Sequence, residues 1–181
     1  MDNAEHMPLP VSRLVMMDPG YLCLPASPAR LCTQVASGVV VTMFDRQRSL
    51  GGMGHYLHPR RMGSESTSIF AAPALVELLN MFIQAGSRLD RLETFVYGGS
   101  DNPEVASNEF GRGGLNLRAG LEILTKLGVR VAGTDIGGRY ARRLVFYTAT
   151  GESVVAKVTD VLSADAWYPR LGGGSTLGRQ S

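Results

Sequence analysis

Few residues of this chain are suited to covalent or metal chemistry. Its 181 residues include two cysteines, Cys23 and Cys32, and three histidines. Two cysteines cannot form a four-cysteine zinc site. His55 and His58 suggest a metal site at first sight, but side chains three residues apart on a strand face opposite sides, and no carboxylate or thiolate follows nearby. The sequence therefore predicts neither a metal site nor a cofactor.

A glycine-rich segment at residues 111–116 precedes a stretch with helical spacing. Such a segment can hold a phosphate, because helix N-termini present free N–H groups. It lacks the Lys-Ser/Thr pair of a P-loop and the spacing of a dinucleotide-binding fingerprint. We therefore interpret it as a tight entry into a helix.

Composition and charge exclude several classes of protein. With 44% hydrophobic and 19% charged residues, the chain can fold as one domain that buries about 70% of the surface of the unfolded chain. A net charge of +2 is too small for a dedicated binder of nucleic acid or anionic membranes. No apolar run reaches the roughly 18 residues of a membrane span, and the N-terminus lacks a signal-peptide pattern. We expect a cytoplasmic protein with reduced thiols and no membrane insertion.

Two segments have the spacing of amphipathic helices that could position a site. In residues 71–84 apolar side chains recur every three or four residues, and Gly86 supplies a stop. Residues 114–127 repeat this pattern and end at Gly128. The sequence predicts a helix over each segment.

Shorter apolar runs predict the strands. Residues 39–44 are too uniformly apolar for a half-exposed strand, which favours a buried central strand. Because helices and strands alternate, we expect an α/β fold with one mixed sheet covered by two helices. The domain should span residues 13–158, between a loose lead-in (1–12) and a flexible tail (159–181). Further strands are expected at residues 13–17, 50–57, 92–97, 129–135, 143–148 and 154–158, the last two joined by a hairpin turn at 150–152.

Four blocks of sequence, in order and at matching separations, resemble the CheD family of bacterial chemoreceptor glutamine deamidases. In addition, Gly113-Gly-Leu-Asn116 fits the Gly-x-x-Asn at the start of the family's second long helix. The resemblance spans about residues 14–158 and implies a CheD-like α/β sandwich that acts in bacterial chemotaxis. The four blocks are residues 33–45, 51–59, 95–99 and 135–151.

The resemblance implies a papain-like reaction on a glutamine of a chemoreceptor. A cysteine thiolate attacks the side-chain amide, a histidine acts as base and then protonates the departing ammonia, and water releases glutamate. Thr33 matches an assisting threonine of the family, and His55 matches the histidine. The position of the family's cysteine is occupied by Gly38.

Gly38 departs from the family pattern. The family's first block typically reads Gly-Ser-Cys before a valine run, whereas this chain reads Ala36-Ser37-Gly38 before Val39. The separation between positions 38 and 55 is that of the family. Removing a comparable nucleophile from a hydrolase costs about a million-fold in turnover. We therefore expect that the binding shape persists and that catalysis is lost or severely weakened.

Two other residues are candidate nucleophiles for an active deamidase. Ser37 adjoins the lost thiol, but neighbours on an extended segment point to opposite faces, so its hydroxyl should face away from His55. Cys32 directly precedes Thr33 and should point out of the pocket for the same reason. Cys23 has no base near it in the sequence.

Four glycines are candidate substrate-binding residues: Gly98, Gly99, Gly137 and Gly138. They form simple turns or, as the resemblance favours, they let the backbone approach a substrate helix and donate N–H groups to an oxyanion.

The densest positive cluster consists of Arg139, Arg142 and Arg143. It is either a solvated strand edge or a surface that faces acidic receptor helices. Loops at residues 60–67 and 100–112 could form a groove for such helices. The resemblance implies two partners, the cytoplasmic helices of methyl-accepting chemotaxis receptors and a CheC-type phosphatase, and no nucleic acid is expected.

Overall fold

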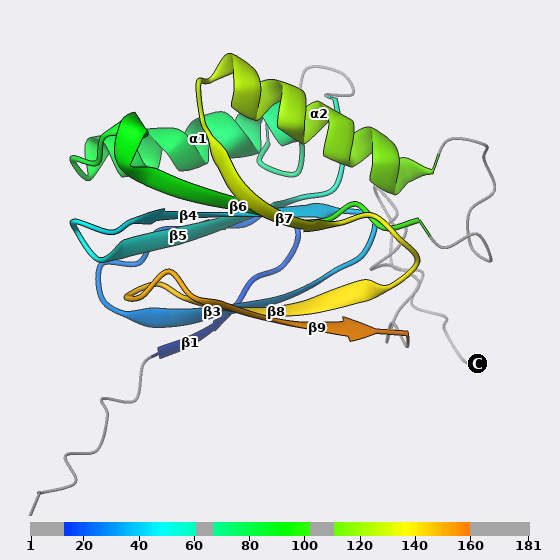
Figure 1. Ribbon diagram of the computed structural model, residues 1–181, viewed down its shortest axis with the longest axis horizontal. Coiled ribbons are helices and arrows are strands. Elements are labelled where there is room, and N and C mark those ends of the chain that lie inside the picture. Colours follow the sequence, from blue (N-terminus) through cyan, green and yellow to red (C-terminus); the bar gives the residue numbers. More distant parts are fainter. Residues whose placement is uncertain (1–12, 61–66, 102–110, 160–181) are drawn as a thin grey trace, which may run out of the picture.

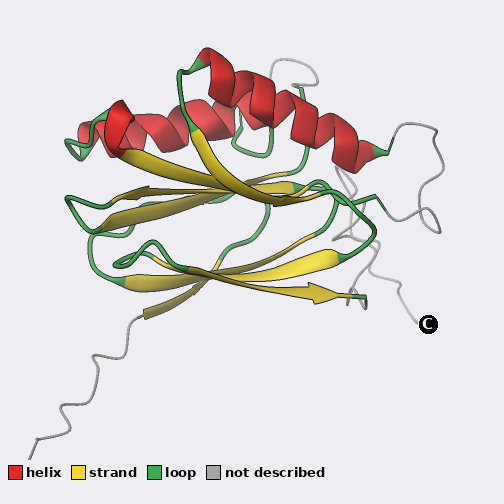
Figure 2. Cartoon of the chain, viewed as in Figure 1, coloured by secondary structure: helices red, strands yellow, loops and turns green. Residues whose placement is uncertain are grey.

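The structure, a computed structural model, describes residues 13–60, 67–101 and 111–159 and has three layers (Figure 1). A layer of two helices covers one face of a five-stranded sheet, and a four-stranded sheet packs on the other face (Figure 2). The predicted lead-in, nearly all of the two predicted groove loops and the tail beyond residue 159 lie outside the described residues.

The five-stranded sheet has the order β2-β5-β4-β6-β7. Neighbouring strands are antiparallel, except that β6 and β7 are parallel. All seven residues of the central strand β4 are buried, as the apolar run predicts, because layers cover both faces of this sheet. The strands are β2 (Leu22–Cys23), β4 (Val39–Asp45), β5 (Leu50–Tyr56), β6 (Leu92–Gly98) and β7 (Val131–Ile136).

The four-stranded sheet has the order β1-β3-β8-β9. β1 is parallel to β3, and the other pairs are antiparallel. Buried and half-buried residues alternate along β3, because one face of this sheet packs on the five-stranded sheet and no described helix or strand covers the other face. The strands are β1 (Arg13–Met16), β3 (Ala29–Val35), β8 (Ala141–Tyr147) and β9 (Ser153–Val158).

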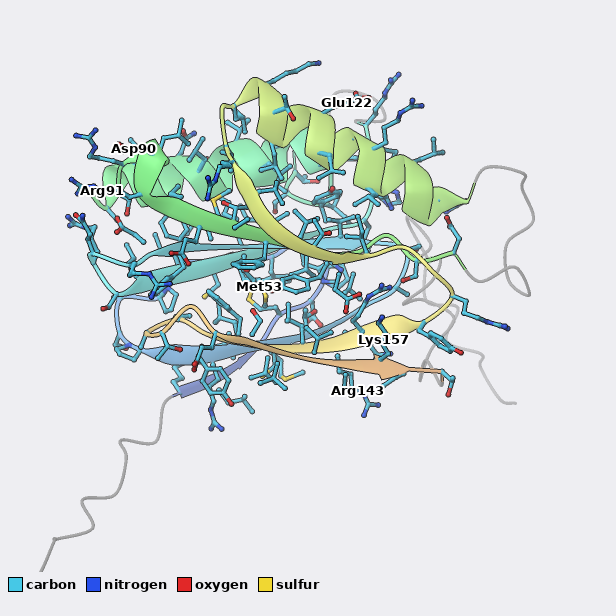
Figure 3. All side chains as sticks on the ribbon, in the orientation of Figure 1. Met53, Asp90, Arg91, Glu122, Arg143 and Lys157 are labelled. Atoms are coloured by element: carbon cyan, nitrogen blue, oxygen red, sulfur yellow. The ribbon has the colours of Figure 1, made fainter. Side chains whose placement is uncertain are left out.

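The two helices, α1 (Ala71–Gln84) and α2 (Arg112–Lys126), contact each other and pack on β5 and β4 respectively. Their inward side chains, among them Leu78, Phe82 and Leu124, form one core with the strands beneath. A second core fills the space between the two sheets, where Met53 of β5 lies near Leu31 of β3 in the same cluster (Figure 3). None of the helices in the described ranges is long and apolar enough to cross a membrane.

The α/β sandwich with two helices is confirmed, and α1 has its predicted bounds. α2 begins at Arg112 rather than at residue 114. The expectation of a single sheet is wrong, because the strands divide between two sheets. A short apolar run shows that a strand is buried, but it does not show which other strand forms hydrogen bonds with it.

Candidate functional site

His55 of β5 lies between the two sheets and is 1% exposed. Its Nδ1 atom is 3.1 Å from Thr33 Oγ1, which comes from β3 of the opposite sheet. The Thr33 hydroxyl donates its only hydrogen to the carbonyl oxygen of Met17 at 2.7 Å, so it accepts from His55. The imidazole proton therefore resides on Nδ1, and Nε2 carries a free electron pair.

The Nε2 atom of His55 is buried and has no hydrogen-bond partner in the described part of the chain. Burial lowers the pKa of His55 from 6.5 to about 3, so the imidazole is neutral at neutral pH. A neutral imidazole with an unoccupied Nε2 can accept a proton from a neighbouring nucleophile. The ring therefore has the protonation state and the orientation of a general base.

Gly38 lies directly beside this nitrogen. A β-carbon built on Gly38 would be 3.0 Å from His55 Nε2, 2.9 Å from the carbonyl oxygen of Tyr56 and 2.8 Å from Leu57 Cδ2. Gly38 is not among the glycines with positive φ, so its backbone allows a side chain. The structure thus brings Thr33, Gly38 and His55 together, and any side chain at position 38 requires a shift of the Leu57 side chain and a smaller one between the backbone of residue 38 and the Tyr56 carbonyl.

Three hydrogen bonds hold the backbone around Gly38. The carbonyl oxygens of residues 36, 37 and 38 accept in turn from Ser100 N–H at 2.8 Å, Asn116 Nδ2 at 2.8 Å and Gly99 N–H at 2.7 Å. Asn116, which is 1% exposed, also donates to the carbonyl oxygen of Leu57 at 2.7 Å. The sequence indicated Asn116 only as part of a motif. A polar residue on the inward face of an amphipathic helix is the signal that could have indicated a structural partner for it.

Of the four predicted substrate-binding glycines, Gly98 and Gly99 contact the backbone of Gly38, and Gly137 contacts Gly98 in turn. Gly98 has φ +100°, a conformation that favours glycine, and a β-carbon there would meet the carbonyl oxygen of Gly38. The N–H groups of Gly99 and Gly137 are both engaged, the latter by the carbonyl oxygen of Gly98 at 2.8 Å. A β-carbon on Gly138 would meet nothing within 4 Å. Contact of these glycines with a substrate remains a prediction.

The alternative nucleophiles differ in their placement. Ser37 is 3% exposed. Cys32 lies one position before Thr33 on β3, where side chains alternate between faces, so its thiol lies on the uncovered side of the sheet. Burial raises the pKa of the Cys23 and Cys32 thiols, which keeps both protonated at neutral pH. A protonated thiol is a poor nucleophile.

Residues 58–157 match the CheD family model, which is described as CheD chemotactic sensory transduction. This match covers more than half of the chain. The chain belongs to the CheD family. The CheD match begins three positions after His55, so Thr33, Gly38 and His55 lie outside the matched residues.

Similar CheD proteins align over a larger part of the chain. A protein of Methanococcus vannielii is 31% identical over 137 residues, which are 75% of this chain and 89% of that protein. A protein of Geobacter sulfurreducens is 30% identical over 156 residues, which are 86% of this chain and 95% of that protein. Both carry the name "probable chemoreceptor glutamine deamidase CheD", the second as CheD 2.

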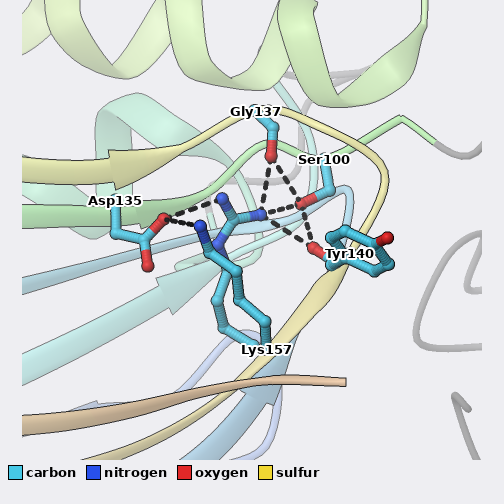
Figure 4. A network of polar contacts seen from close by, with 6 residues as sticks. Ser100, Asp135, Gly137, Tyr140 and Lys157 are labelled. Atoms are coloured by element: carbon cyan, nitrogen blue, oxygen red, sulfur yellow. Dashed lines mark hydrogen bonds and ion pairs between the residues drawn. The ribbon is translucent and has the colours of Figure 1, made fainter. Parts of the chain in front are cut away.

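In this CheD-family domain the predicted arginine cluster is divided between the interior and the surface. Arg142 is 2% exposed, whereas Arg143, the next residue, is exposed and points away from the sheets (Figure 3). The prediction of a joint surface cluster is wrong for Arg142, because alternation along β8 turns it inward. Its guanidinium donates to four groups: Asp135 Oδ1 at 2.9 Å, the carbonyl oxygens of Gly137 at 2.7 Å and Tyr140 at 2.8 Å, and Ser100 Oγ (Figure 4).

The glycine-rich segment of this CheD-family chain forms the predicted tight helix entry. The Asp101 carboxylate accepts from Gly113 N–H at 2.8 Å and from Gly114 N–H at 3.0 Å, at the start of α2. These two donors are therefore satisfied by the chain's own carboxylate rather than left for a phosphate.

His58 lies against the ring of Phe70, with ring centroids 5.7 Å apart. Within the described ranges, no group of three or more His, Cys, Asp or Glu residues is arranged to hold a metal ion.

Proposed function

We propose that this CheD-family chain acts in bacterial chemotaxis by binding chemoreceptors, and that it does not hydrolyse a glutamine amide at a useful rate. The relatives named as chemoreceptor glutamine deamidases support the receptor as partner. The observation that carries the proposal is the short distance at Gly38, where a β-carbon would be 3.0 Å from His55 Nε2. The chain places a residue without a side chain where the base meets its nucleophile.

The remaining parts of the site support binding without the covalent step. In an active deamidase, a thiol gives its proton to the histidine, the sulfur attacks the amide carbon, and ammonia leaves with that proton. His55 can accept the proton and Thr33 can orient the ring, but Gly38 has neither a proton to give nor an atom to attack with. A bound glutamine would therefore stay neutral, and the charge of the receptor would not change.

The partner is proposed to be the cytoplasmic helices of a methyl-accepting chemotaxis receptor. An alternative partner is a CheC-type phosphatase. Because both of these partners would be met in the cytoplasm, we propose that the protein acts there. The exposed guanidinium of Arg143 can speed encounter with acidic helices, because charge complementarity raises association rates. Capture of either partner by the purified chain, with every glutamine of the receptor fragment unchanged, would support the binding role.

The decisive experiment measures ammonia release and conversion of glutamine to glutamate in a receptor fragment. We expect no reaction with the natural chain and a gain of activity with Gly38→Cys. Adding His55→Ala to Gly38→Cys should abolish the gained activity. Gly38→Ala is the matched control, because it adds a β-carbon beside Nε2 without adding a nucleophile.

The space around position 38 calls for one companion variant. A β-carbon there would be 2.8 Å from Leu57 Cδ2, so the gain from Gly38→Cys should increase when Leu57→Ala makes room for the sulfur. The proposal fails if the natural chain releases ammonia at a rate that His55→Ala abolishes. In that case Ser37→Ala and Cys32→Ala would identify the nucleophile of an active deamidase.

A further inference from the structure

Asn116 is the side chain that joins the two halves of the site. Its Nδ2 group has two hydrogens, and both are used: one on the carbonyl oxygen of Ser37 at 2.8 Å, the other on that of Leu57 at 2.7 Å. The first carbonyl directly precedes Gly38, and the second follows His55 by two residues. One amide group therefore ties the segment that carries position 38 to the strand end that carries the base.

The orientation of this amide is fixed by its surroundings. A flipped Asn116 would place Oδ1 against two carbonyl oxygens, which is repulsive. Asn116 is 1% exposed, so water does not readily replace the hydrogen bonds that its amide makes. Buried carbonyl groups without a donor are costly, so loss of this side chain would take a donor from both carbonyls. The pairing of Val39 with Tyr56 in the β4–β5 ladder would then be left to hold the two segments together.

The helix that carries Asn116 is itself docked at this point. The Tyr56 hydroxyl donates to the backbone carbonyl of Asn116 at 3.0 Å, and Tyr56 is 0% exposed. A β-carbon on Gly113, one turn earlier in α2, would meet the backbone of Gly99 and Ser100. The start of α2 therefore lies in direct contact with the β5 and β6 ends, and Asn116 has little freedom to move away.

We propose that Asn116 is a positioning residue: by binding the carbonyl groups of Ser37 and Leu57 together, it keeps residue 38 in contact with His55 Nε2. This inference rests on the proposed function in one respect: position 38 is taken as the place where the nucleophile of an active deamidase would stand. Asn116 touches no reacting atom in this arrangement. It acts through the backbone on both sides of the gap between residue 38 and the imidazole.

The test uses the full chain carrying Gly38→Cys, whose new thiol reports its contact with His55. The rate of alkylation by iodoacetamide is measured between about pH 5 and pH 10, and peptide mass spectrometry separates position 38 from Cys23 and Cys32. Where the thiol gives its proton to Nε2, the thiolate lies beside an imidazolium and the thiol titrates below its ordinary pKa of about 8.5. We expect Asn116→Ala to return the midpoint to about 8.5 and to slow alkylation at pH 7 by up to about thirtyfold, because only a few per cent of a thiol with that pKa is thiolate at pH 7.

Leu124→Ala is the matched control for destabilisation. Leu124 lies on the same helix and is 1% exposed, so its truncation weakens the packing of α2 without removing a hydrogen bond to residue 37 or 57. We expect it to leave the midpoint of the position-38 thiol unchanged. The proposal is overturned if Asn116→Ala also leaves the midpoint unchanged, or if the thiol of Gly38→Cys itself titrates at about 8.5.

A second measurement needs no new cysteine. Gly99 N–H donates to the carbonyl oxygen of Gly38, so amide hydrogen exchange at Gly99 reports how firmly that segment is held. In the otherwise natural chain, Asn116→Ala should speed exchange at Gly99 at least tenfold and leave the β4 amides protected. Unchanged exchange at Gly99 would overturn the proposal. Neither measurement needs a receptor, so a Gly38→Cys variant that fails to deamidate counts against the proposed function alone.

Discussion

The two faces of the four-stranded sheet are built from the same strands and have opposite properties. Its inner face packs on the five-stranded sheet and carries Thr33, Leu31 and Arg142, all at most 4% exposed. Its outer face carries Met16 and Val154, which are 68% and 57% exposed, and no described helix covers it (Figure 1). The residues of the candidate site that this sheet provides all belong to the inner face.

One step along a strand decides whether a reactive group can take part in the site. Thr33 meets His55, whereas Cys32, one position earlier, faces outward. Arg142 is enclosed by hydrogen bonds, whereas Arg143 is exposed. Thr33 and Asn116 reach the site from opposite sides of the five-stranded sheet, and position 38, beside the imidazole, carries no side chain.

The largest difference between the two faces is expected for the neighbouring arginines. Arg142→Met should lower the free energy of unfolding by about 3 kcal/mol, because the Asp135 carboxylate, which is partly buried, loses the guanidinium at 2.9 Å and keeps only Lys157 at 3.6 Å. Arg143→Met should change it by no more than about 0.5 kcal/mol, because that side chain is solvated. Urea denaturation of both variants measures the difference. Equal costs would mean that the inward and outward faces are not distinct.

The sequence predicted the parts of the fold whose signal is local. The bounds of α1 and the full burial of β4 followed from the spacing and the uniformity of apolar side chains. The division into two sheets did not follow, because strand pairing depends on contacts between segments far apart in the chain. The role of Arg142 was missed for the same reason: its main charged partner, Asp135, belongs to the other sheet.

The candidate site was predictable only in part. Thr33, Gly38 and His55 were indicated by the resemblance to the CheD family, and the structure brings them together. The bond from Asn116 to Ser37 spans 79 positions, and no local pattern contains such a contact. The engaged N–H groups of Gly99 and Gly137 likewise depend on tertiary pairing. The family resemblance identified the groups, and only the packed structure gave their partners.

A second effect concerns pH and the buried imidazole between the two sheets. The folded-state pKa of His55 is about 3 and its ordinary value is 6.5, so the unfolded chain binds a proton here in a range where the folded chain does not. The contribution of His55 to the free energy of unfolding is therefore fully present above about pH 6.5. It is lost as pH falls from there toward about 3, by at most about 1.4 kcal/mol per pH unit. His55→Leu should remove this part of the slope.

The control for that experiment is the half-buried histidine nearby. Burial, and secondarily the charge of Arg112, lowers the pKa of His58 as well, but its exposure makes the shift smaller. His58→Leu should therefore remove a smaller part of the acid slope than His55→Leu. Unfolding free energies measured by denaturant titration between about pH 4 and pH 7 give both slopes. If the His55→Leu slope matched that of the natural chain, the imidazole would not be buried as a neutral group.

The smallest effect is expected on the outer face. Met16 is 68% exposed, so Met16→Ser removes little buried apolar surface and should change the free energy of unfolding by at most about 0.5 kcal/mol. Leu31→Ala, on the inner face of the adjacent strand, should cost about 2 to 5 kcal/mol because Leu31 is 0% exposed. Denaturant titration of both variants gives these two costs, and their ratio tests whether the inner face is buried and the outer face exposed. A cost above about 1 kcal/mol for Met16→Ser would mean that the outer face is covered in solution, and the contrast between the faces would then be wrong.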